Sequence, residues 1–113
     1  MNTTANVRGT ECEIWSPTQA PNDVQMHVAT LLGIAPEKVK VNVTLMGGGF
    51  GRRLGWDYAL EAASVSKAIG GGPVQLMWTR EDDTKHGYFQ AAAMHQLSAG
   101  LDEGKRVVSW THR

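Results

Sequence analysis

The sequence has a single cysteine, Cys12, among its 113 residues. No intramolecular disulfide can form, and the paired-cysteine spacing of a zinc site is missing. Nothing in the chain supplies the cysteine ligands of an iron–sulfur cluster. Cys12 lies between Glu11 and Glu13, whose negative charges disfavour a thiolate. We therefore expect Cys12 to be a structural residue.

Net charge is also missing, because 11 Lys and Arg residues balance 11 Asp and Glu residues. This balance gives no electrostatic reason to expect binding to nucleic acid or to a membrane surface. No apolar run approaches the length of a membrane span, and residues 1–6 lack the basic and apolar regions of a signal peptide. The compartment, cytoplasmic or periplasmic, is left open. A hydrophobic content of 42% and a charged content of 19% predict a globular chain with one modest core.

Strand and helix signals alternate along the first half of the chain. Residues 4–7 and 11–15 predict a hairpin. Asn22 is the expected N-cap of a helix, with a glutamine three residues later at the capping-box position and Gly33 just beyond its end. Residues 39–45 alternate apolar and polar side chains, which predicts a strand with one buried face.

The second half predicts another helix over residues 56–69, with a small-residue surface of alanines suited to packing on a sheet. A strand follows over residues 74–79, then a charged, exposed segment over residues 80–85. Residues 93–99 and 107–111 predict paired strands. The expected fold class is α+β, a mixed β-sheet with two helices packed on it, in the order ββ-α-β-α-β-β-β. We expect residues 1–113 to form a single domain, with the terminal hairpin making the sheet mixed.

The most informative stretch is Gly47-Gly48-Gly49-Phe50-Gly51-Arg52-Arg53, between a predicted strand and a predicted helix. Glycines allow positive φ and a close approach of the backbone to a ligand. Consecutive N–H groups beside a helix N-terminus favour an anion. The residues alone leave a tight turn without a ligand as an equal alternative. A Walker loop and a dinucleotide fingerprint are both excluded, because arginines stand where each motif requires other residues.

Other candidate residues carry weaker signals. The histidines His27, His86, His95 and His112 lack the spacing of a metal site. The acidic run at residues 81–83 is best interpreted as a solvated turn. No catalytic and no metal-ligating residue is predicted from the chain.

Several separated segments together resemble a known family. They include Trp15-Ser16-Pro17-Thr18-Gln19, the stretch from Met46 to Arg53, and Pro73-Val74-Gln75-Leu76-Met77-Trp78-Thr79-Arg80-Glu81-Asp82-Asp83 followed by His86. The chain resembles the molybdenum-binding subunit of the xanthine dehydrogenase/aldehyde oxidase family, in its isoquinoline 1-oxidoreductase beta-subunit branch. The resemblance runs from about residue 5 to the C-terminus. It implies an oxidoreductase of aldehydes or N-heterocycles.

The resemblance also implies roles for individual residues. Gln19 would approach the oxo ligand of molybdenum, and Phe50 and Gly51 would lie against the metal centre with backbone N–H contacts. Residues 47–49, Gly47, Gly48 and Gly49, would shape the pocket for molybdopterin cytosine dinucleotide together with Arg52. The pterin dithiolene holds the metal, so no protein ligand to it is expected.

The same resemblance implies that this chain is one part of a larger subunit. The family's glutamate base lies far C-terminal to this region, so we expect the chain to be inactive alone. Its implied partners are the remaining domains of the parent subunit and an iron–sulfur subunit, and exposed docking surfaces predict self-association. The alternative is a freestanding binding or assembly module that keeps the fold without oxidoreductase activity. One departure is Gln90, which stands where the branch usually has arginine. We also expect the glycine loop to be mobile without its cofactor.

Overall fold

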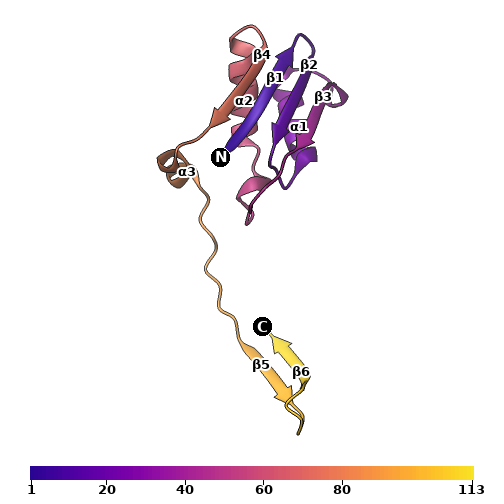
Figure 1. The fold of residues 1–113 in the computed structure, drawn as a ribbon, viewed down its shortest axis with the longest axis vertical. Helices are drawn as coiled ribbons and strands as arrows, with labels where there is room; N and C mark the ends of the chain where they lie inside the picture. The colour runs from indigo at the N-terminus through magenta and orange to yellow at the C-terminus, as the bar shows by residue number, and fades with distance from the viewer.

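The computed structural model describes residues 1–113 and confirms the α+β class (Figure 1). Four strands form the main sheet in the spatial order β3-β2-β1-β4. Their bounds are Asn2–Arg8 for β1, Glu11–Ser16 for β2, Val39–Val43 for β3 and Gly72–Met77 for β4. The predicted N-terminal hairpin is present as the antiparallel pair β1–β2.

Two crossovers explain why the sheet is mixed. Helix α1 (Pro21–Leu32) connects β2 to β3, and these two strands pair in parallel. Helix α2 (Asp57–Ala68) then carries the chain across the sheet to β4, which pairs antiparallel with β1. Strands β2, β3 and β4 therefore run in one direction and β1 runs against them. Their carboxyl ends share one edge of the sheet.

Both helices cover the same face of the sheet. Helix α2 packs on β1 and β4, α1 packs on β3, and the two helices contact each other. The core contains the helix-facing residues of the sheet and small or branched residues of the helices: Ala5, Val7, Cys12, Ile14, Val39, Val24, Val28, Ala29, Leu32, Ala59, Ala62 and Ala63. The alanines let α2 approach the sheet closely, as predicted. Ala68 is the exception and is exposed. None of the helices has the length and apolarity that crossing a bilayer would require.

The start of α1 differs from the prediction, whereas its end does not. The helix begins at Pro21 with Ala20 at the N-cap and no side-chain cap. Proline fits the first turn because the missing N–H would have had no helical partner. Asn22 is therefore not the N-cap, and the Gln25 amide instead donates to the Val39 carbonyl at 2.8 Å. Gly33 ends the helix at a φ of 70°, as its position predicted.

Two further elements depart from their predicted form. Strand β3 ends at Val43, which is 54% exposed, so its buried face is limited to the beginning of the strand. The charged segment predicted as exposed turns out to be a short helix, α3 (Arg80–His86). A capping box stabilises the start of that helix. The Thr79 hydroxyl accepts the Asp82 N–H, and the Asp82 carboxylate accepts the Thr79 N–H.

The C-terminal hairpin is a separate sheet. Strands β5 (Leu97–Leu101) and β6 (Val107–His112) pair antiparallel with each other only. The prediction that this hairpin makes the main sheet mixed was wrong, and the parallel β2–β3 pair has that role. An extended segment separates the hairpin from the rest of the chain, which gives dimensions of 70 × 32 × 22 Å (Figure 1). We call residues 1–86 the body and residues 97–112 the hairpin.

Candidate cofactor-binding site

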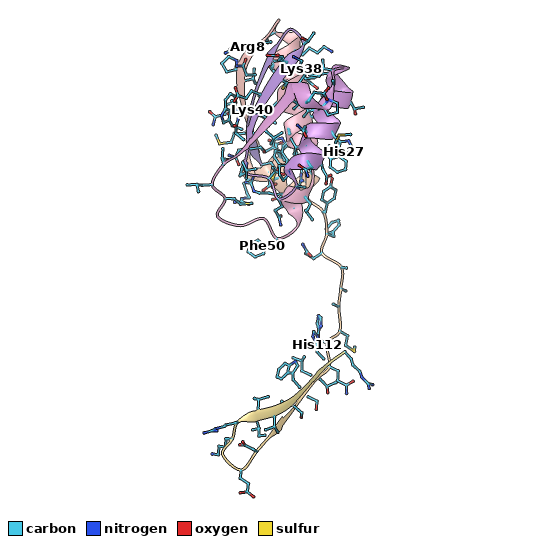
Figure 2. All side chains as sticks on the ribbon, turned by 90° about the vertical axis from the view of Figure 1, so that its right-hand side faces the viewer. Arg8, His27, Lys38, Lys40, Phe50 and His112 are labelled. Atoms are coloured by element: carbon cyan, nitrogen blue, oxygen red, sulfur yellow. The ribbon has the colours of Figure 1, made fainter.

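The predicted site residues lie on two loops at the carboxyl edge of the sheet. One loop, residues 17–20, follows β2, and the other, residues 44–56, follows β3. Ligands of sheets with crossover helices commonly bind at this edge, because the loops after neighbouring parallel strands meet there. Figure 2 shows Phe50 at the outer rim of the second loop, at the opposite end of the body from Arg8 and Lys38.

Arg53 joins the two loops. Its carbonyl accepts hydrogen bonds from the Gln19 N–H at 3.0 Å and from the Thr18 hydroxyl at 3.2 Å. Its guanidinium donates to the Pro17 carbonyl at 3.1 Å and to Asn2 Oδ1 at 3.0 Å. Sequence reasoning noticed Arg53 only as the end of the glycine stretch. Its position directly beside that stretch was the available signal, but its partners are 36 and 51 residues away.

Gln19 lies against the glycine loop (residues 47–51). Its Oε1 accepts the N–H of Gly51 at 3.1 Å, and its Nε2 has no hydrogen-bond partner within the chain. A Cβ on Gly49 would overlap the Gln19 side-chain amide. Gly49 is therefore needed for a close approach, and the amide donor of Gln19 stays available to a ligand.

The backbone of the glycine loop presents unpaired donors to its surroundings. Phe50 and Gly51 have φ values of 48° and 87°, both in the left-handed region. The N–H groups of the four residues 47–50 make no hydrogen bond within the chain. The Phe50 side chain is 88% exposed. Four consecutive free donors beside a glutamine amide fit an oxygen-rich anionic group such as the pyranopterin and phosphates of molybdopterin.

The Arg52 side chain is engaged within the chain. It donates two hydrogen bonds to the Asp57 carboxylate, at 3.0 Å and 2.6 Å. Its guanidinium also lies over the rings of Trp78, at 5.4 Å, and Tyr88, at 4.9 Å. The Asp57 hydrogen bonds raise the pKa of Arg52, partly offset by desolvation. Arg52 thus anchors the end of the glycine loop to Asp57, and an anion would have to compete with Asp57 for its guanidinium.

Residues outside the loop do not form a second centre. No three His, Cys, Asp or Glu side chains gather in a geometry that could hold a metal ion. His27 stacks on Trp56 with ring centroids 3.7 Å apart, and His86 Nδ1 lies 2.9 Å from the Asp82 carbonyl within α3. Cys12 is buried, and burial raises the pKa of its thiol to about 11 despite a hydrogen bond from the Asn6 backbone. The prediction of a structural cysteine agrees with this environment.

A hollow of about 420 Å³ lies away from the glycine loop. Its walls come from β1, β2, β3 and the turn before β3, at the end of the body where Arg8, Lys38 and Lys40 are seen in Figure 2. Lys38 pairs with Glu11 at 3.0 Å and Lys40 with Glu13 at 2.9 Å. The charges of this hollow therefore neutralise one another across the strands, and nothing in its lining favours one class of ligand.

Comparison with known proteins identifies the class of domain. The sequence profile of the molybdopterin cofactor-binding domain matches residues 2–113. The chain belongs to this family. Its relatives among isoquinoline oxidoreductases, xanthine dehydrogenases and aldehyde oxidases place it within the xanthine dehydrogenase/aldehyde oxidase family, which confirms the resemblance found in the sequence.

The individual relatives are much longer than this chain. The isoquinoline 1-oxidoreductase subunit beta of Brevundimonas diminuta is 42% identical over 88% of the chain and 13% of its own length. A protein of Gluconacetobacter polyoxogenes named membrane-bound aldehyde dehydrogenase [pyrroloquinoline-quinone] is 35% identical over 89% of the chain and 13% of its own length. The crystal structure of quinoline 2-oxidoreductase from Pseudomonas putida 86 shares the fold, with a TM-score of 0.64 and 24% identity over 98% of the chain and 14% of that protein. The chain thus spans about an eighth of these proteins.

Proposed function

We propose that this chain forms one wall of the cofactor pocket of a molybdenum hydroxylase that oxidises aldehydes or N-heterocycles, and that it is inactive alone. The family defines the cofactor class, molybdopterin. We further propose the cytosine dinucleotide form. When bound, the cofactor supplies the molybdenum centre at which the substrate is oxidised.

The observation that carries this proposal is the arrangement of donors on the glycine loop. The N–H groups of residues 47–50 are free, and the side-chain oxygen of Gln19, Oε1, accepts the Gly51 N–H. Only the amino end of the Gln19 amide is then left to face a ligand, and an amide N–H₂ can donate to an oxo group without ligating the metal. We assign binding to Gln19, Gly47, Gly48, Gly49, Phe50 and Gly51, with Arg52 supporting the loop through Asp57.

The exposure of one loop edge explains why a single wall is insufficient. Gly47, Gly48, Phe50 and Gly51 are exposed and Gly49 is only half-buried. The cofactor would therefore contact this chain on one side. We propose that the remaining domains of the parent subunit supply the other walls and the catalytic base, and that an iron–sulfur subunit accepts the electrons.

Titration of the 113-residue chain with molybdopterin cytosine dinucleotide, followed by pterin fluorescence under anaerobic conditions, tests the binding site. Two further titrations, one with molybdopterin that lacks the nucleotide and one with cytidine monophosphate, show how much the pterin and the nucleotide each contribute to the binding affinity. We expect binding of the dinucleotide that Gly49→Ala weakens about tenfold or more, because the new methyl displaces Gln19. Ser98→Ala, on the distant strand β5, is the matched control and should bind like the wild-type chain.

Absence of dinucleotide binding would show that the isolated loop is not a working site. Equal affinity of the Gly49→Ala and wild-type chains would place the site elsewhere. Inactivity is tested by incubating the cofactor-loaded chain with isoquinoline or benzaldehyde and an artificial electron acceptor. Turnover above that of the free cofactor would contradict the proposal that the chain is inactive alone.

A further inference from the structure

We propose that two glutamines, Gln19 and Gln90, clamp the peptide unit between Phe50 and Gly51 from opposite sides. Gln90 is thereby a positioning residue for the backbone donors of the glycine loop. The clamp itself is a property of the free chain, and its consequence for the cofactor rests on the function proposed above.

The two hydrogen bonds converge on one amide plane. The Gly51 N–H donates to Gln19 Oε1 at 3.1 Å, and the Phe50 carbonyl accepts from Gln90 Nε2 at 3.2 Å. In a trans peptide, the C=O and the N–H are coplanar and point in opposite directions. A rotation of this plane therefore breaks both hydrogen bonds at once.

This peptide needs support that its own side chain does not give. Phe50 has a φ of 48°, a conformation that a bulky residue adopts only under constraint. Its ring is 88% exposed, so packing does not hold the residue in place. Gly51, with a φ of 87°, adds no resistance of its own because glycine tolerates many conformations. The Arg52 N–H donates to the Gly49 carbonyl at 2.9 Å and so closes a turn around Phe50 and Gly51. The two glutamines add a constraint on the peptide plane at the centre of that turn.

The Arg52 side chain explains how Gln90 reaches the loop. Asp57 holds the guanidinium with two hydrogen bonds, and Tyr88 lies 4.9 Å from it. In an extended segment, residues two apart point to the same side. Tyr88 on Arg52 therefore brings Gln90 to the Phe50 carbonyl, two residues before Arg52. Phe89, between Tyr88 and Gln90, is 102% exposed. The segment after α3 thus contacts the Phe50 carbonyl of the glycine loop and the Arg52 side chain just after the loop.

The glycines alone predicted a mobile loop, whereas the clamp fixes the orientation of the Phe50–Gly51 peptide before a ligand arrives. With the Phe50–Gly51 plane held, the Gly51 N–H keeps Gln19 Oε1 in place, so the free amino group of Gln19 keeps a constant direction beside the loop. Donors arranged in advance need no reorganisation on binding, which is the physical basis of preorganised recognition.

Two variants with the same chemical change separate the clamp from a general effect of charge. Gln90→Glu removes the donor to the Phe50 carbonyl and brings a carboxylate oxygen against it. Gln19→Glu keeps an acceptor for the Gly51 N–H and removes only the free amino group. Gln90→Arg restores a donor at residue 90.

The measurement uses the full ¹⁵N-labelled chain without cofactor. The readouts are amide hydrogen exchange of Gly51 and the nuclear Overhauser effect between the Phe50 Hα and the Gly51 amide proton, which follows the orientation of the peptide plane. We expect Gly51 exchange to be about five- to tenfold faster in Gln90→Glu, in line with the loss of one hydrogen bond. Gln19→Glu should show unchanged or slower exchange, and Gln90→Arg should return it to the wild-type rate.

Unchanged Gly51 exchange and an unchanged Overhauser effect in Gln90→Glu would overturn the clamp, and so would equal acceleration in Gln19→Glu. Amide chemical shifts of the body show whether each variant remains folded. Because Gln90 is exposed, we expect its substitution to leave the body folded. Failure of the wild-type chain to bind molybdopterin cytosine dinucleotide would affect the proposed function but not this measurement. The two proposals can therefore fail separately.

Discussion

The body and the hairpin contain similar apolar residues but use them differently. All 19 buried residues of the chain lie in the body, between Thr3 and Ser66. In the hairpin, Leu97, Leu101, Val107, Val108 and Trp110 are all between 56% and 65% exposed. Strands pair through hydrogen bonds in both regions. Burial is achieved only in the body, where two helices cover one face of the sheet.

This difference shows that strands can pair without forming a hydrophobic core. A two-stranded hairpin satisfies its hydrogen bonds locally but is marginally stable in water without a covering layer. The hairpin strands even contain a register shift between Gly100 and Leu101, and such irregularities bend a strand pair rather than strengthen it. We therefore expect the energetic effect of a substitution to depend on the region in which it lies.

The largest contrast is expected from truncating an apolar side chain in each region. Ile14→Ala removes a fully buried residue of β2 and should lower the free energy of unfolding by about 3 kcal/mol. Leu97→Ala removes a side chain that is 56% exposed, so the change should stay within about 0.5 kcal/mol. Urea denaturation followed by circular dichroism measures both. Equal losses would mean that the hairpin has a packed surface in solution.

A hydroxyl removed from each region gives the next contrast. Ser66 Oγ accepts the Val7 N–H at 2.9 Å and donates to the Gly72 carbonyl at 2.6 Å, both inside the body. Ser66→Ala leaves a buried N–H unpaired and should cost about 2 kcal/mol. Ser109→Ala removes an acceptor for the Gly100 N–H, but that bond is exposed and water can replace it. We expect less than about 0.5 kcal/mol there, by the same urea experiment.

The buried thiol makes the stability of the body depend on alkaline pH. Burial raises the pKa of Cys12 from 9.0 to about 11, so the folded chain holds this proton more strongly than the unfolded chain. The free energy of unfolding therefore keeps its full value below pH 9 and falls as the pH rises toward 11. We expect it to be lower by about 1 kcal/mol at pH 10. Unfolding measurements at pH 8 and pH 10 should show this loss, and Cys12→Ala should remove it.

Thiol reactivity provides the hairpin control for the same prediction. Cys12 should react slowly with a disulfide reagent at pH 8 in the folded chain and rapidly in urea. The thiol introduced by Ser98→Cys in a Cys12→Ala background should react rapidly in both conditions. Rapid reaction of Cys12 in the folded chain would contradict its burial.

The smallest contrast concerns the two arginines Arg52 and Arg106. Arg52→Lys loses the paired hydrogen bonds to Asp57 and the contacts with Trp78 and Tyr88, which lysine cannot reproduce. Because Asp57 is partly exposed, solvent screening limits the expected loss to about 1 kcal/mol. Arg106→Lys, in the exposed turn of the hairpin, should have no measurable effect on urea denaturation. A larger effect at Arg106 than at Arg52 would reverse the comparison.

Local patterns in the sequence predicted most of the secondary structure. The N-terminal hairpin, both long helices, the strand before α3 and the C-terminal hairpin were all expected, because each has a clear apolar period or a glycine at its end. Helix α3 was missed because it lacks an apolar face, and it depends on the Thr79–Asp82 capping box instead. Asn22 was chosen as N-cap on residue preference, whereas the loop after β2 delivers Pro21 to the helix start.

The candidate site shows the same division. Resemblance to the family singled out Gln19 and the residues of the glycine loop, and the structure places Gln19 against Gly51. The contacts from Arg53 to the first loop and from Gln90 to the Phe50 carbonyl were not foreseen, because they join residues 34 to 40 positions apart. Their roles toward a cofactor stay proposals to be tested by titration.

The sequence by itself determined the elements, the α+β class, the glycine loop at a strand–helix junction and the family. These properties follow from local periodicity and from residues whose types and spacing are distinctive. Only the tertiary structure decided that β4 pairs with β1, that the hairpin is a separate sheet, and that Gln19 and Gln90 hold one peptide plane between them. Such contacts depend on which distant segments meet, and an apolar or polar pattern shows which face seeks a partner without specifying the partner.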